Sequence, residues 1–125
     1  MRKPNRRIAV VDDDASVRKA LVRLLETSSY DARGFPSARE LLFGLADARP
    51  ECMIVDLQMP SMSGLELQHH MARTGIKIPT IVITAHDEPG SRERCMAAGA
   101  AAYLLKPIRK AALLTAIDKA METST

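Results

Sequence analysis

Five polar residues stand at the ends of short apolar runs in this sequence, and their side chains are the candidates for chemistry. They are Asp12, Asp13, Asp56, Thr84 and Lys106. Short apolar runs bounded by turn residues are typical of buried strands in a parallel sheet. In open sheets of that kind, ligands bind beyond the carboxyl ends of the strands. We therefore expect these side chains, which follow four separate strands, to share one rim of the sheet.

The residue types at this rim fit phosphoryl transfer. Carboxylates placed close together repel one another and raise their own pKa values unless a positive charge offsets them. Mg²⁺ can do so, because it prefers a few carboxylates together with water and phosphate oxygens. Lys106 would supply a point charge for a phosphoryl oxygen, and Thr84 a hydroxyl donor. The set predicts a Mg²⁺ site in which the carboxylate of Asp56 is a nucleophile.

The elements that must position these residues follow from the hydrophobic pattern. Strands are expected over residues 8–11, 30–35, 53–56, 80–85 and 101–105. Helices are expected over residues 15–28, 36–49, 64–74, 91–98 and 109–121, with Asp14 as the cap of the first. Alternating strands and helices predict one α/β domain, in which helices cover both faces of a parallel sheet.

Length and charge restrict the class of protein. A chain of 125 residues can form one domain with its own core, and we assign residues 8–125 to it and residues 1–7 to a basic N-terminal tail. The net charge is +3, but the Lys and Arg residues outside the tail are scattered among acids, and the chain has no Trp for base stacking. We expect no direct binding of nucleic acid.

Localisation is inferred from apolar runs and cysteines. No apolar run is long enough to span a bilayer, and the first residues show no signal-peptide pattern. Cys52 and Cys95 lie far apart and have no metal-ligand spacing, which favours reduced thiols. We expect a cytoplasmic protein without membrane association.

Four separated motifs, in order along nearly the whole chain, resemble the receiver (phosphoacceptor) domain of two-component response regulators. They are Asp12-Asp13, the segment D-L-Q-M-P-S-M-S-G that begins at Asp56, Ile83-Thr84-Ala85, and Lys106-Pro107. The resemblance implies a flavodoxin-like (βα)5 fold, a three-layer sandwich with the strand order 2-1-3-4-5 that is known from flavodoxin and a chemotaxis receiver. It also implies a cis peptide bond between Lys106 and Pro107.

The resemblance implies a role for each acidic residue. Asp56 would accept a phosphoryl group from the phosphohistidine of a sensor histidine kinase. Asp56 and Asp13 would bind Mg²⁺ directly and Asp12 largely through water. The main-chain carbonyl of Gln58 would be a further Mg²⁺ ligand.

The resemblance also implies a conformational switch. Lys106, the Thr84 hydroxyl and the Ala85 amide would contact the phosphoryl oxygens. Tyr103 stands where the family keeps an aromatic residue that swings inward when Thr84 is drawn toward the phosphoryl group. Taken singly, Lys106 is a solvated strand end, Thr84 a strand former and Tyr103 a half-buried aromatic, so the roles depend on the whole set.

Two residues beside this set are expected to control the lifetime of the phosphorylated form. Gln58 lies two residues after Asp56, and His86 lies two residues after Thr84. In receivers, these flanking positions line the path of the water that attacks the phosphoryl group. We hypothesise that Gln58 and His86 set the rate of that attack.

The partners implied are a sensor histidine kinase and, on phosphorylation, a second copy of the chain. The chain is then either a stand-alone receiver or part of a longer regulator. The residues around Asp56 and Thr84 are similar to those of receivers joined to helix-turn-helix domains, which favours a DNA-binding output domain beyond residue 125. One alternative is a Mg²⁺-dependent phosphatase with an aspartyl nucleophile, but its second acid would stand where this chain has Gln58. Another is a binding module that is never phosphorylated, although no acid, Thr or Lys of the set is missing. We expect a signalling domain rather than an enzyme.

Overall fold

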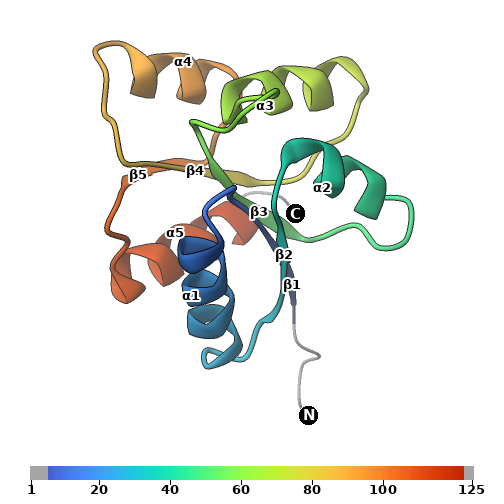
Figure 1. The fold of residues 1–125 in the computed structure, drawn as a ribbon, viewed down its shortest axis with the longest axis vertical. Helices are drawn as coiled ribbons and strands as arrows, with labels where there is room; N and C mark the ends of the chain where they lie inside the picture. The colour runs from blue at the N-terminus through green and yellow to red at the C-terminus, as the bar shows by residue number, and fades with distance from the viewer. Residues whose placement is uncertain (1–5, 123–125) are drawn as a thin grey trace.

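The computed structural model describes residues 6–122, which form a parallel sheet of five strands in the order β2-β1-β3-β4-β5 (Figure 1). The strands are β1 (Arg7–Val11), β2 (Asp31–Phe35), β3 (Cys52–Asp56), β4 (Thr80–Thr84) and β5 (Ala102–Leu105). The helices are α1 (Ala15–Glu26), α2 (Ala38–Gly44), α3 (Gly64–Arg73), α4 (Ser91–Ala97) and α5 (Lys110–Glu122). The predicted fold class and strand order are confirmed.

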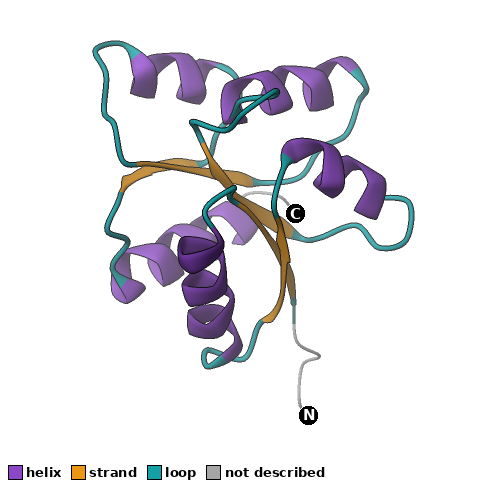
Figure 2. Ribbon diagram, viewed as in Figure 1, coloured by secondary structure: helices purple, strands orange, loops and turns teal. Residues whose placement is uncertain are grey.

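Helices cover both faces of the sheet and make a three-layer sandwich (Figure 2). Helices α1 and α5 lie on one face, where their leucines pack against Ile54, Ile81 and Ile83 of the central strands. Helices α2, α3 and α4 lie on the other face, against Met53 and Val55 among others. Neighbouring strand residues point to opposite faces. A strand buried on both faces therefore has to be apolar throughout, as β3 is up to its final acid.

The helix starts follow local capping chemistry. The Asp14 carboxylate accepts hydrogen bonds from the amides of Ser16 and Val17 at 2.9 and 3.3 Å, as the sequence predicts. Helix α3 begins with a capping box in which the Ser63 hydroxyl accepts from the Glu66 amide and the Glu66 carboxylate accepts from the Ser63 amide. Both caps lie at the rim where the functional residues were expected.

Some element bounds differ from expectation for local reasons. Strand β1 begins at Arg7, which had been assigned to the tail, because Arg7 pairs with Asp31 of β2; residues 1–5 lie outside the described part. Helix α1 ends at Glu26 because the hydroxyls of Thr27 and Ser28 bond to the Leu24 carbonyl and begin a turn. Helix α2 ends at Gly44, so residues 45–49 are not helical.

Gly64 brings the start of α3 against the end of β3. A Cβ atom at this position would lie 2.7 Å from the Asp56 carbonyl oxygen and 3.1 Å from the Leu57 Cα atom, and the Gly64 amide donates to the Leu57 carbonyl at 2.9 Å. The clash is with backbone atoms, which cannot rotate away as a side chain can. Glycine is needed here because of this close approach.

We predict that Gly64→Ala lowers the free energy of unfolding by about 1–3 kcal/mol, because the added methyl must push the helix away from the strand. Urea unfolding followed by circular dichroism measures the change. An amide NMR spectrum should show the largest shifts around Asp56. Unchanged stability together with an unchanged spectrum near Asp56 would contradict the prediction.

Candidate functional site

Three carboxylates meet at the carboxyl ends of β1 and β3. Oxygen atoms of Asp12, Asp13 and Asp56 all lie within 4.8 Å of one another. Strands β1 and β3 are hydrogen-bonded neighbours with Val11 opposite Val55, so the residues that follow them stand side by side. Asp12 is fully buried and Asp56 is 4% exposed, whereas Asp13 faces solvent. The sequence prediction that these acids converge is confirmed.

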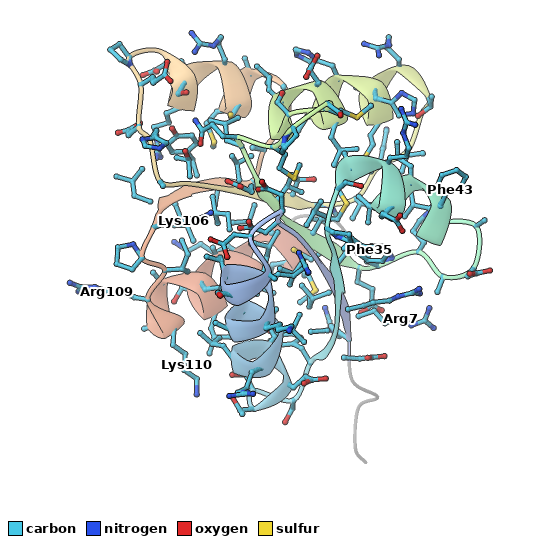
Figure 3. The ribbon with its side chains drawn as sticks, viewed as in Figure 1. Arg7, Phe35, Phe43, Lys106, Arg109 and Lys110 are labelled. Carbon is cyan, nitrogen blue, oxygen red and sulfur yellow. The ribbon has the colours of Figure 1, made fainter. Side chains whose placement is uncertain are left out.

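Lys106, labelled in Figure 3, reaches this cluster from the end of β5. Its Nζ atom lies 3.0 Å from Asp12 Oδ2 and 3.4 Å from Asp56 Oδ1. The Lys106 amide donates to the Thr84 carbonyl at 2.8 Å, which fixes the start of the loop, and the Lys106–Pro107 peptide bond is cis as expected. A single ammonium group therefore faces two of the three acids.

The crowding of charges is visible in the pKa of Asp56. Burial and the neighbouring charge of Asp12 raise it from 3.8 to about 6, even though Lys106 acts in the opposite direction. Burial alone would lower the pKa of Lys106. Hydrogen bonds and charge interactions with Asp12 and Asp56 outweigh burial, so the pKa of Lys106 is raised. The acids thus carry more negative charge than one lysine offsets.

Asp12 is held by hydrogen bonds from α1 and its cap, and its second carboxylate oxygen faces Lys106. Its Oδ1 atom accepts from the Asp14 amide at 2.9 Å, and its carbonyl accepts from the Arg18 guanidinium at 2.8 Å. The Arg18 side chain packs over Gly34 of β2. A Cβ atom on residue 34 would lie 2.9 Å from Arg18 Cγ, so the glycine leaves room for this side chain. Asp12 Oδ2 is paired with the Lys106 ammonium, and no other described group donates a hydrogen bond to it. A buried carboxylate oxygen of this kind, next to two further carboxylates, fits a metal ion.

Thr84 lies at the end of β4, the strand between β3 and β5, and it is fully buried. Its Oγ1 atom lies 2.6 Å from Gln58 Oε1 and accepts a hydrogen bond from the His86 amide at 3.0 Å. The Gln58 side-chain amide also reaches the His86 carbonyl at 3.4 Å. The sequence indicated that Gln58 and His86 flank the site, but it gave no sign that the Gln58 side chain binds the Thr84 hydroxyl.

Tyr103 lies under α4 rather than at the surface. It is 6% exposed, its hydroxyl donates to Asp87 Oδ1 at 3.0 Å, and the Arg92 guanidinium lies 6.0 Å from its ring centre. Asp87 and Arg92 are exposed residues on the segment between β4 and α4 and on α4 itself. Tyr103 is thus more buried than the half-buried aromatic of the alternative interpretation. Sequence reasoning did not foresee its partner Asp87.

Other side chains that could bind a metal or react lie away from the site or are buried. His69 is exposed on α3, and Met59 packs in the core. Cys52 and Cys95 are both buried and free, and burial raises the pKa of Cys52 to about 12. None of the helices in the described range is both long and apolar enough to cross a bilayer.

Comparison with known proteins identifies the family. Residues 8–118 match the family model of the response regulator receiver domain. The chain belongs to this family. The fold of the receiver agrees with the crystal structure of FixJ-N, with a TM-score of 0.87, 34% sequence identity, and coverage of 98% of this chain and 96% of that one.

Curated relatives of this receiver domain are longer proteins. It is 37% identical to nodulation protein W of Bradyrhizobium diazoefficiens over 92% of this chain and 51% of that protein. It is 35% identical to the transcriptional regulatory protein FixJ of Rhizobium meliloti over 92% of this chain and 56% of that protein. The chain therefore spans about half the length of the curated relatives it matches. It is a receiver domain of two-component response regulators, and the named relatives include a transcriptional regulator.

The raised pKa of Asp56 predicts how its charge affects stability. In metal-free buffer the unfolded chain loses this proton near pH 4 and the folded chain near pH 6, so stability falls as the pH rises between these values. We expect Asp56→Asn to raise the free energy of unfolding at pH 7 by about 1–3 kcal/mol, since a shift of one pKa unit corresponds to about 1.4 kcal/mol. Below pH 4 the gain should vanish.

Urea unfolding of both proteins in EDTA, from pH 3.5 to 7.5, measures this effect. Asp47→Asn, which changes an exposed acid, serves as the matched control and should show no such gain. A mutant less stable than the wild type at pH 7 would show that the Lys106 contact outweighs the repulsion.

Proposed function

We propose that this receiver accepts a phosphoryl group on Asp56 from the phosphohistidine of a sensor histidine kinase, in a Mg²⁺-dependent reaction. The observation that carries the proposal is a buried carboxylate that lies between two further acids and a lysine. An Asp56 oxygen attacks phosphorus, the P–N bond breaks, and its electron pair returns to the imidazole of the kinase. The product is an acyl phosphate on Asp56.

The pKa of Asp56 suits this step. A value of about 6 without metal leaves the carboxylate mostly ionised at neutral pH, and a bound cation would favour this nucleophilic form further. Lys106 lies close enough to Asp56 to bind a phosphoryl oxygen on the product. It would then exchange its present contact with the Asp56 carboxylate for one with that oxygen. The Thr84 hydroxyl and the Ala85 amide would bind the other oxygens.

The metal site would be formed by Asp12, Asp13 and Asp56 together with the main-chain carbonyl of Gln58. Oxygen ligands and the excess of negative charge fit a hard divalent cation such as Mg²⁺. When bound, Mg²⁺ offsets the charge of the acids and of the incoming phosphoryl oxygens. Asp12 and Asp13 would thus orient the metal while Asp56 reacts.

The phosphorylated receiver would change shape on the side of α4, β5 and α5. Drawing Thr84 toward the phosphoryl group would affect the loop between β4 and α4, because the Thr84 hydroxyl is hydrogen-bonded to His86 in that loop. Tyr103 would be affected in turn, because its hydroxyl donates to Asp87 in the same loop. This side also carries exposed apolar residues, with Leu105 51% and Met96 37% exposed. Such residues suit a dimer contact formed on phosphorylation.

The output of the switch would lie in another domain. FixJ of Rhizobium meliloti is a transcriptional regulatory protein about twice as long as the match. We infer that this receiver controls a DNA-binding output domain and does not bind DNA itself. We also place it in the cytoplasm, where its kinase partner would phosphorylate it.

A phosphatase is the less favoured function. Its general acid would stand at Gln58, whose amide cannot serve as a general acid or base at neutral pH and which bonds to Thr84 instead. The receiver would therefore hydrolyse only its own acyl phosphate. A module that binds without phosphorylation is also less favoured, because the acids and Lys106 are all present and in contact.

Incubation with acetyl phosphate and Mg²⁺ tests the proposal. Intact-protein mass spectrometry should show one added phosphoryl group in the wild type, and none in Asp56→Asn or after chelation of Mg²⁺ by EDTA. Continuous release of phosphate from small esters would indicate the phosphatase. No modification of the wild type under any of these conditions would support the binding module.

The lifetime of the phosphorylated form should depend on Gln58 and His86. Both side chains are exposed beside Thr84, where water approaches the phosphoryl group. We expect Gln58→Ala and His86→Ala each to change the decay rate of the acyl phosphate by severalfold, measured by loss of the added mass after removal of acetyl phosphate. His69→Ala, on α3, is the control. Decay rates equal to that of the wild type would end this hypothesis.

A further inference from the structure

The Thr84 hydroxyl is fully engaged before any phosphoryl group arrives. A hydroxyl carries one proton, and the short distance of 2.6 Å to Gln58 Oε1 makes that oxygen its main acceptor. The His86 carbonyl, at 3.0 Å, is the weaker alternative acceptor, and the His86 amide donates back to Thr84 Oγ1 at 3.0 Å. Thr84 therefore cannot donate to a phosphoryl oxygen without first breaking its hydrogen bond to the Gln58 side chain.

We propose that Gln58 is a positioning residue that acts as a latch: its side-chain carbonyl holds the Thr84 hydroxyl in the unphosphorylated orientation and so opposes switching. This proposal rests on the proposed function, and it goes beyond the role of Gln58 in water access. The latch concerns the equilibrium between two hydrogen-bond acceptors of the Thr84 hydroxyl, Gln58 and the phosphoryl group. The role in water access concerns the rate at which the acyl phosphate is hydrolysed.

The backbone places the two partners of this latch close together. Asp56 lies opposite Ile83 in the pairing of β3 with β4, and the Leu57 amide donates to the Ile83 carbonyl at 2.8 Å. The chain beyond Leu57 therefore runs beside the chain beyond Ile83, and Gln58 reaches Thr84 from the loop that follows the phosphoacceptor. A change at Asp56 and a change at Thr84 are linked by this short path.

The environments of the two residues make the latch reversible. Thr84 is fully buried, so its hydroxyl needs a partner in either orientation. Gln58 is exposed and borders a groove lined also by Pro60, Glu88 and Arg94, so its carbonyl can bond to water once Thr84 has left. Release of Gln58 is therefore possible without leaving a buried polar group unpaired.

Beryllofluoride with Mg²⁺, a stable mimic of the acyl phosphate, separates the latch from hydrolysis because nothing is hydrolysed. We expect Gln58→Met, which keeps the length of the side chain but removes the acceptor, to bind beryllofluoride about three- to tenfold more tightly, the range that one neutral hydrogen bond supplies. Isothermal titration of the whole chain at saturating Mg²⁺ measures this affinity.

A double-mutant cycle with Thr84 decides whether the gain in beryllofluoride affinity depends on the Thr84 hydroxyl. In a Thr84→Ser background, which keeps the hydroxyl, Gln58→Met should again tighten binding; in a Thr84→Val background it should have no effect. An equal gain in all backgrounds, or no gain in the wild-type background, would overturn the latch. Absence of beryllofluoride binding by the wild type would instead overturn the proposed function and the latch with it.

The unliganded protein supplies a second readout if Thr84→Val binds too weakly to titrate. A buried hydroxyl proton that is bonded to Gln58 should exchange slowly with water and be visible by NMR. Gln58→Met should speed up this exchange and shift the Thr84 methyl signal, while His69→Ala leaves both unchanged. The same exchange rate in Gln58→Met and wild type would overturn the proposal.

Discussion

The balance of charge at the carboxyl rim is the constraint on which the rest of the structure depends. Three carboxylates lie within 4.8 Å of one another, and one lysine faces two of them at 3.0 and 3.4 Å. Burying this group without the lysine would leave charges with no partner, which is strongly unfavourable. With the lysine, burial and the remaining excess of negative charge together raise the pKa of Asp56 to about 6. A site of this kind is prepared to gain a cation.

The sheet topology imposes that arrangement. Asp12 and Asp56 are neighbours because β1 and β3 pair directly, and Lys106 comes from β5, beyond β4. Thr84 ends β4, the strand between β3 and β5, and so lies at the same rim. The close approach of Gly64 to the Asp56 carbonyl fixes the loop that carries Gln58. The helices complete the core on both faces, so the strand ends cannot move apart without unpacking it.

A second network, made of hydrogen bonds, connects this rim with the side of the molecule formed by α4 and β5. Gln58, Thr84 and His86 are joined by hydrogen bonds, and one residue further along, Asp87 accepts from the hydroxyl of Tyr103. Each of these bonds is modest in water, but Thr84 and Tyr103 are buried, so neither can leave its partner without finding another. These contacts are the path along which the proposed change of partner at Thr84 would reach the surface near Leu105 and Met96.

Sequence alone determined the number and order of the elements and the convergence of Asp12, Asp13, Asp56 and Lys106. It could do so because apolar runs, caps and parallel pairing are local or topological properties, and Asp14 capped its helix as its residue type required. Only the tertiary structure decided that the Gln58 side chain turns to Thr84, that Arg18 supports Asp12, and that Tyr103 is buried against Asp87. Those contacts depend on the directions of side chains in loops and across strands, which are set by packing and have no periodic signal in the sequence.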